Sequence, residues 1–340
     1  MTTKDFSGIL ADVLLCESMT NPLGIDAVPP RLSWRFGQTA SGQRQTAYRV
    51  LAASTKECLE RDNGDLWDSG KVDADSSVHV PYQGTELVSG QRCWWKVKAW
   101  DRNGREGEWS ESAWFEMGML EDGAWSGHWI TVPDADGSKR GAAPFFRREF
   151  DIHDDVVSAR AYICGLGYHE LYLNGVKVGD NVLDPGFTRY DRRALYVTHD
   201  ITDSVRKGRN GAGFILGNGF YNQTFADNWR FHEAPWRDSP RCLLQLRINC
   251  ADGSCIDISS DEDWRVNEGP IVFNGTRSGE TYDAGSELDG WSEPGYADAN
   301  WCRAARVCGP GGTLKAQMLP PIKVARTIEP VAVNEVKPGT

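Results

Sequence analysis

The sequence has 340 residues, which is too long for one ordinary β-sandwich and enough for two domains of ~100–200 residues each. Its formal net charge of -11 disfavours a nucleic-acid partner, because a phosphate backbone is held by clustered Lys and Arg side chains. The same charge disfavours an anionic membrane surface, and no apolar stretch approaches the length of a membrane span. We therefore expect neither a nucleic acid nor a membrane as partner, whereas a neutral glycan is compatible with this charge.

The nine cysteines are odd in number and irregularly spaced, and no CxxC pair occurs. This pattern disfavours a structural zinc site. Residues 1–13 contain neither the apolar core nor the cleavage site of a secretory signal peptide. Reduced thiols in the cytoplasm are the simplest interpretation, so we expect a cytoplasmic protein.

Helix signals are rare along the chain. Residues 54–62 combine a Ser cap with Glu57, Leu59 and Glu60, and they predict about two helical turns. Elsewhere apolar residues recur with a period of two, and turn residues recur every ten or so positions. This pattern is typical of β-sandwiches and predicts an all-β fold.

The first predicted domain spans residues 1–120. Its strongest strand is residues 92–101 (RCWWKVKAWD), in which Cys93, Trp95, Val97 and Ala99 share one face. The segment 97–111 (VKAWDRNGREGEWSE) resembles the last hairpin of a fibronectin type III domain. We therefore expect a fibronectin type III-like sandwich that acts as a spacer without a ligand.

The second predicted domain spans residues 121–312 and starts where the composition changes. Strands are predicted at about 156–164, 168–174, 193–199, 211–217, 241–249 and 254–260, as expected of a jelly-roll sandwich of the carbohydrate-binding kind. Residues 313–340 include Pro320 and Pro321. We interpret them as a linker plus the start of a missing β-domain.

An ordered set of motifs runs through the second domain. It comprises residues 161–175 (AYICGLGYHELYLNG), 178–186 (VGDNVLDPG), 189–190 (RY), 196–201 (YVTHDI), 216–222 (LGNGFYN), 234–237 (APWR) and 279–284 (GETYDA). In this order the motifs resemble the N-terminal domain of bacterial α-L-rhamnosidases, the glycoside hydrolases of family 78. The preceding fibronectin-like unit matches the layout of that family, so the resemblance covers residues 10–335.

The resemblance implies a role in the hydrolysis of terminal α-L-rhamnosides. In that family the catalytic carboxylates lie on an (α/α)6 barrel, and this sequence contains no such helical segment. We therefore expect the accessory, substrate-orienting part of an α-L-rhamnosidase. Its expected partners are the catalytic domain of the same enzyme and L-rhamnose or a rhamnosylated glycan, and the chain alone is expected to be inactive.

The resemblance also implies a sugar site, because some related N-terminal sandwiches bind L-rhamnose through a calcium ion. Asp180 and Asn181 would hold Ca²⁺, with Asn228 as a further ligand, and Trp229 would cover the apolar face of the sugar. Calcium takes 6–8 oxygen ligands and can accept two vicinal hydroxyl groups. Asp and Asn are also ordinary turn residues, so a structural role for these side chains stays open.

No catalytic residue is assigned in this chain. Glycoside hydrolysis with inversion requires two carboxyl groups about 6.5–9.5 Å apart, and the candidates are Asp180, Asp184, Glu280 and Asp283. We expect Glu280 and Asp283 only to support the site. His169 has no paired Ser, Cys or second His at a catalytic spacing, and we interpret it as a hydrogen-bonded histidine at a strand end.

Two alternatives belong to other functional classes. The chain could be a stand-alone carbohydrate-binding protein, or a purely structural module without a ligand of its own.

Overall fold

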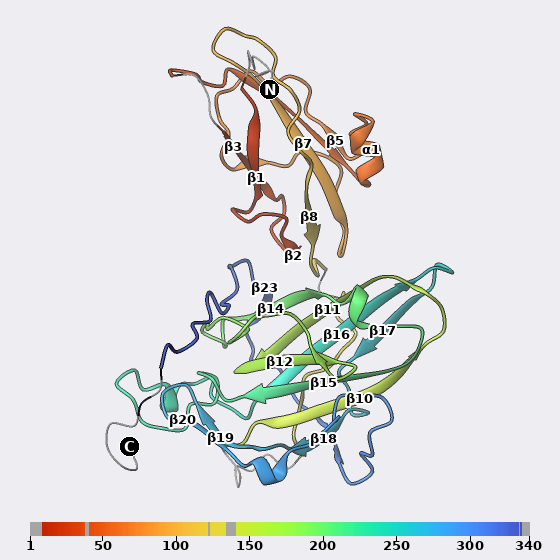
Figure 1. Ribbon diagram of the computed structural model, residues 1–340, viewed down its shortest axis with the longest axis vertical. Coiled ribbons are helices and arrows are strands. Elements are labelled where there is room, and N and C mark those ends of the chain that lie inside the picture. The colour runs from red at the N-terminus through yellow and green to blue at the C-terminus, as the bar shows by residue number, and fades with distance from the viewer. Residues whose placement is uncertain (1–8, 38–40, 122, 134–140, 333, 335–340) are drawn as a thin grey trace.

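The computed structural model describes residues 9–37, 41–121, 123–133, 141–332 and 334. These residues form two β-domains, one above the other in Figure 1, with one short α-helix. The all-β sandwich prediction is confirmed. Within the described part of the chain, no helix is long and apolar enough to cross a membrane. Residues 1–8 of the first predicted domain and residues 335–340 of the predicted C-terminal segment lie outside the described residues.

The first domain packs two sheets against each other. One sheet has the order β1 (Ala11–Cys16), β3 (Arg31–Phe36) and β6 (Val80–Pro81). The other has the order β2 (Leu23–Ile25), β8 (Ala113–Met117), β7 (Arg92–Trp100), β4 (Ala47–Ala53) and β5 (Trp67–Asp68). Helix α1 (Lys56–Glu60) follows β4, and the Thr55 hydroxyl accepts a hydrogen bond from the Cys58 N–H. A helix was predicted at 54–62 with a Ser cap; the helix is present and has five residues, and its cap is Thr55 rather than Ser54. The side-chain oxygen at the N-cap satisfies a free N–H group.

Burial of one face of β7 accounts for the core of this domain. Cys93, Trp95 and Val97 are fully buried, as their alternation predicted. They face Trp34 from the other sheet, whose indole N–H donates to the Gln45 side-chain oxygen at 2.8 Å. A buried aromatic side chain stabilises the fold by about 1.5–3 kcal/mol, provided that its polar atom has a partner.

The second domain is a larger sandwich. Its six-stranded sheet has the order β13 (Val176–Lys177), β12 (Tyr168–Leu173), β15 (Gly208–Gly217), β10 (Pro144–Ile152), β18 (Arg265–Glu268) and β21 (Cys302–Arg303). The opposing sheet has the order β22 (Ala305–Arg306), β9 (Ile130–Thr131), β16 (Arg241–Cys250), β11 (Val156–Leu166), β14 (Arg193–Asp200) and β23 (Thr313–Ala316), with β17 (Cys255–Ser259) paired to β16. Three short 3-10 helices, η1 (Thr202–Ser204), η2 (Phe231–Glu233) and η3 (Ala284–Ser286), lie in its loops.

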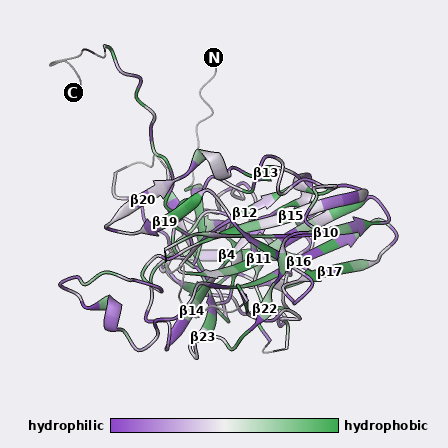
Figure 2. Ribbon diagram, turned by 90° about the horizontal axis from the view of Figure 1, so that it is seen from below, coloured by the Kyte–Doolittle hydropathy of each residue, from purple (hydrophilic) through white to green (hydrophobic). Residues whose placement is uncertain are grey.

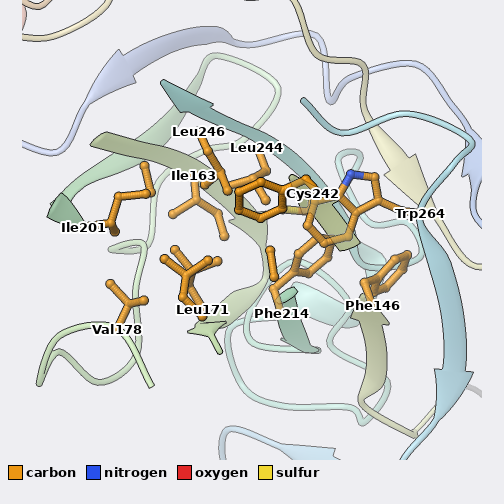
Figure 3. Close-up of a cluster of buried hydrophobic side chains, with 14 of the residues drawn as sticks. Phe146, Ile163, Leu171, Val178, Ile201, Phe214, Cys242, Leu244, Leu246 and Trp264 are labelled. Carbon is orange, nitrogen blue, oxygen red and sulfur yellow. The ribbon is translucent and has the colours of Figure 1, made fainter. Parts of the chain in front are cut away.

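The core of the second domain lies between these two sheets. Figure 3 shows Phe146, Phe214 and Trp264 together in it, with Phe146 and Phe214 stacked at 4.6 Å between ring centroids. Strand residues alternate between this core and the outer faces, as along β12, where every second residue from His169 to Leu173 is buried. Figure 2 shows hydrophobic and hydrophilic residues side by side along β10, β16 and β17. The outer face of the six-stranded sheet is partly covered by a separate hairpin, β19 (Ile271–Gly275) and β20 (Gly279–Tyr282).

The two domains meet closely at the end of β8. The Met119 N–H donates to the Tyr196 hydroxyl at 2.9 Å. Gly24 has a φ of +73°, and a Cβ there would lie 2.0 Å from the Thr198 side-chain oxygen. Glycine is therefore required both by the backbone conformation and by the close approach of β14.

Strand β23 lies beyond the predicted domain boundary at residue 312. It pairs in parallel with β14, from Arg193 opposite Thr313 to Tyr196 opposite Ala316. Chain segments far apart in the sequence therefore share one sheet. The second domain thus includes residues that were expected to form a linker and the start of a missing β-domain.

Candidate functional site

The predicted pair Asp180 and Asn181 lies on the loop that follows β13. The Asp180 carboxylate forms an ion pair with the Lys323 ammonium group at 2.6 Å, and this hydrogen-bonded charge lowers the pKa of Asp180. The Asn181 amide donates to the Asp184 carboxylate at 2.7 Å, and Asp184 also accepts a hydrogen bond from Gln317 at 2.9 Å. Both predicted residues therefore belong to the contact between this loop and the C-terminal segment.

This arrangement does not fit a calcium ion as it stands. Calcium requires 6–8 oxygen ligands, and the carboxylate of Asp180 is already neutralised by Lys323. The described residues contain no group of three or more His, Cys, Asp or Glu side chains that could hold a metal ion. The dependence of L-rhamnose binding on calcium therefore stays a prediction.

Asn228 and Trp229 lie elsewhere, on the long loop between β15 and β16. Both are exposed, and the Arg277 guanidinium lies 5.8 Å from the centre of the Trp229 ring. Among the described residues, no hydrogen bond joins Asn228 to Asp180 or Asn181. The structure therefore brings Trp229 next to the β19–β20 hairpin rather than next to Asp180.

Glu280 and Asp283, which were expected to support the site, have different surroundings. Asp283 caps η3, where it accepts hydrogen bonds from the Gly285 N–H at 3.0 Å and the Ser286 hydroxyl at 2.9 Å. Glu280 is exposed on β20 and lines a pocket. Asp283 thus has a local structural role, and Glu280 is the predicted residue that borders a concave surface.

That concave surface is a groove of about 560 Å³. We call it the hairpin groove, because it lies between the β19–β20 hairpin and the outer face of the six-stranded sheet at the ends of β12 and β15. Its sheet side includes Tyr168, Ile215 and Gly217, and its hairpin side includes Ile271 and Glu280. A volume of this size is typical of a small-molecule site.

The groove combines apolar and polar groups. Tyr168 and Thr276 contribute hydroxyl groups that pair with each other, and burial raises the pKa of Tyr168. The Glu170 carboxylate lines the same space and accepts a hydrogen bond from Tyr172 at 2.8 Å. Lys177 also pairs with Glu170. The groove can therefore offer an apolar surface with hydroxyl and carboxylate groups at its edge.

A network of asparagine side chains fixes the hairpin to the sheet. Asn218 is 2% exposed and donates to the backbone oxygens of Gly141 and Asn274, both at 3.0 Å. The Asn274 side chain accepts from the Asn218 N–H at 2.8 Å, and Asn222 donates to the Asn218 side chain at 2.7 Å. Asn222 and Asn274 begin the two N-x-T sequences of the chain, so both amides already have protein partners in the folded state.

His169 is a buried structural histidine, as interpreted from the sequence. Its Nδ1 accepts a hydrogen bond from the Gly165 N–H at 3.2 Å. Burial lowers the pKa of His169 to about 3, so the ring is neutral near pH 7. A neutral ring fixed in this way has a packing role.

The hairpin groove is the part of this surface that sequence reasoning missed. It is formed by strands that are distant in sequence, and its floor includes Gly217, a residue without a side chain. The signals in the sequence were the motifs 161–175, 216–222 and 279–284, which contain Tyr168, Gly217 and Glu280.

An immunoglobulin-like domain followed by a larger two-sheet sandwich defines a tandem β-sandwich module. Residues 11–121 match the family model described as "Rha78A-like, N-terminal immunoglobulin domain". Residues 154–326 match the model described as "Alpha-L-rhamnosidase N-terminal domain". The chain belongs to the α-L-rhamnosidases of glycoside hydrolase family 78, and it corresponds to their N-terminal region.

Relatives support this membership along the whole chain. An α-L-rhamnosidase of Formosa agariphila is 37% identical over 362 residues, covering 99% of this chain and 37% of the relative. The solved α-L-rhamnosidase of Dictyoglumus thermophilum is 37% identical, with a TM-score of 0.87, over 97% of this chain and 38% of that chain. The Streptomyces avermitilis α-L-rhamnosidase complexed with L-rhamnose is 26% identical, with a TM-score of 0.84, over 97% of this chain and 48% of that chain. The chain thus spans less than half the length of these relatives.

The resemblance based on the ordered motifs is therefore confirmed. The first domain is named immunoglobulin in the matching family model, so the more specific likeness to fibronectin type III stays a prediction.

Proposed function

We propose that the chain is the accessory, substrate-orienting part of an α-L-rhamnosidase that acts on terminal α-L-rhamnosides. The observation that carries this proposal is the match of its two β-domains to N-terminal models of that family, over residues 11–121 and 154–326. Its partners are the catalytic part of the enzyme and a rhamnosylated glycan. One structural relative was solved in complex with L-rhamnose, which supports the choice of sugar.

The proposed role excludes hydrolysis by this chain alone. Of the four candidate carboxylates, Asp180 pairs with Lys323, Asp184 accepts two side-chain hydrogen bonds, and Asp283 caps a 3-10 helix. Glu280 borders the hairpin groove beside Glu170, whose carboxylate is engaged by Tyr172. A glycosidase requires one protonated acid and one free carboxylate on either side of the bond, and these contacts do not support that arrangement.

A cytoplasmic location forms part of the same proposal. All nine cysteines are free thiols, and five of them are buried. Burial raises the pKa of the Cys164 thiol, which keeps that group in its unreactive protonated form. Free thiols are the usual state of cysteine in a reducing compartment.

Incubation of the chain with an aryl α-L-rhamnoside tests the proposal. We expect no release of the aryl group above a protein-free blank. Turnover that is lost in Glu280→Gln or Asp283→Asn, but kept in the exposed control Asp289→Asn, would contradict the accessory role.

A further inference from the structure

We propose that the hairpin groove is a binding site for a neutral saccharide ring. The choice of L-rhamnose as the test ligand rests on the proposed function. The geometry of the groove supports a saccharide site independently of that function. The site is distinct from the predicted pair Asp180 and Asn181, neither of which lines it.

The groove floor carries no side chain at Gly217. Gly217 is on the outer face of β15, opposite Tyr168 in the antiparallel ladder. Its φ lies outside the left-handed region, and a Cβ there would meet the Asn274 side chain at 3.5 Å and the Tyr168 Cβ at 3.7 Å, which are ordinary contacts. Neither backbone conformation nor packing requires glycine here, and glycine weakens a strand. Its effect is to leave the groove open beside the Tyr168 ring.

The lining of the groove combines apolar and polar groups that suit a sugar ring. Ile215 and Ile271 give the groove apolar walls, and Tyr168 adds an aromatic ring. A sugar ring has an apolar face that packs on such surfaces, while its hydroxyl groups require acceptors and donors at the edge. The carboxylates of Glu170 and Glu280 and the hydroxyl of Thr276 lie there.

The charge of the lining selects among ligands. The two carboxyl groups that line the groove belong to Glu170, which pairs with Lys177, and to Glu280. An anionic ligand such as a uronic acid or a phosphate would be repelled. Carboxylates are good acceptors for hydroxyl groups, so an uncharged polyol fits the site.

The hairpin side of the groove is held in place before any ligand binds. Asn218 and Asn274 fix the hairpin to the end of β15 through two hydrogen bonds of 2.8 and 3.0 Å, and both side chains donate to the Gly141 backbone oxygen. A pre-formed site loses little conformational entropy on binding, which matters for a monosaccharide because it offers few contacts.

Filling the groove floor tests the proposal. Calorimetric titration of the full chain with L-rhamnose, in the presence of a chelator, would compare wild type with Gly217→Ala and Gly217→Val. The matched control is Gly123→Val, because a Cβ at Gly123 meets nothing within 4 Å and its φ is also outside the left-handed region. We expect binding by wild type and the control, weaker binding by Gly217→Ala, and a loss of about tenfold or more in Gly217→Val.

The melting temperature separates occlusion from unfolding. Valine is favoured in strands, so Gly217→Val should melt no lower than wild type. Glu280→Gln should weaken binding without affecting the fold, because Glu280 is exposed. Sodium galacturonate, as the anionic probe, should bind more weakly than L-rhamnose.

Four outcomes would overturn the proposal. They are unchanged affinity in a folded Gly217→Val, loss of binding in Asp180→Ala instead, stronger binding of galacturonate, and no binding of L-rhamnose by wild type at about 10 mM. The hydrolysis assay is independent of these results. Turnover of the aryl rhamnoside would contradict the accessory role and leave the groove intact, whereas an empty groove would leave the accessory role intact.

Discussion

The Glu116 carboxylate of the first domain accepts two hydrogen bonds from the Arg160 guanidinium of the second, at 2.6 and 3.0 Å. It also accepts one from Arg92 of its own domain at 3.0 Å. The Glu116 side chain is only 4% exposed. The two domains are therefore joined by a buried ion pair as well as by the chain and by the hydrogen bond from Met119 to Tyr196.

Glu116→Gln should lower the stability of the chain. The change keeps the shape of the side chain but leaves Arg160, which is 12% exposed, with only the half-exposed Asp200 as counter-charge. Breaking a buried pair with no remaining counter-charge costs about 3–5 kcal/mol, and because Asp200 stays in place we expect a smaller loss. Urea unfolding should show the loss, while the exposed control Glu111→Gln should stay within about 0.5 kcal/mol of wild type. Equal stability of Glu116→Gln and wild type would mean that the pair contributes nothing.

His169 should make the chain less stable in acid. Its pKa is lowered by burial to about 3, against about 6.5 in the unfolded chain, so the unfolded state binds the extra proton as pH falls below 6.5. Its contribution is complete above pH 6.5 and is lost between about pH 6.5 and 3. The loss from this residue should reach about 2–3 kcal/mol at pH 4.5.

Urea unfolding at pH 7 and at pH 4.5 checks this prediction. His169→Asn keeps an acceptor near the position of Nδ1 and removes the titration, so its stability should fall less between the two pH values. The exposed control His153→Asn should show the wild-type pH dependence. An identical pH dependence in His169→Asn and wild type would contradict the prediction.

Asp180→Asn should loosen the C-terminal segment. The substitution removes the ion pair with Lys323, next to the backbone bond from the Val182 N–H to the Ile322 oxygen at 2.9 Å. Hydrogen exchange at Val182 should become faster, and the melting temperature should not change because Asp180 is exposed. Asp191→Asn, which removes the exposed ion pair with Arg189, is the control. Unchanged exchange at Val182 would show that the ion pair does not hold the segment.

Local patterns were sufficient to predict most of the fold. The strand predicted at 193–199 is β14, Arg193–Asp200, and the strand predicted at 241–249 is β16, Arg241–Cys250. These elements follow from alternating burial, which is a property of adjacent residues. Residues 313–340 were expected to form a linker and the start of a missing β-domain. The pairing of β23 with β14 could not be predicted, because it joins residues that are far apart in the sequence.

The candidate site was less predictable for the same reason. Asp180 and Asn181 are loop residues, as expected, but the partner of Asp180 is Lys323, which no local pattern could indicate. Glu280 was selected for its carboxylate, and the structure places it at the hairpin groove. The groove depends on Gly217, and a glycine in a strand carries no functional signal by itself.

The parallel pairing of β23 with β14 has a consequence for self-association. Strand β14 has eight residues, and without β23 its free N–H and C=O groups would form a long edge. Such edges template pairing with other chains. Strand β23 has four residues and covers β14 from Arg193 to Tyr196, so a shorter strand replaces part of the long edge. A fragment cut at residue 312 would keep every other strand of this sheet and would be the more prone to aggregate.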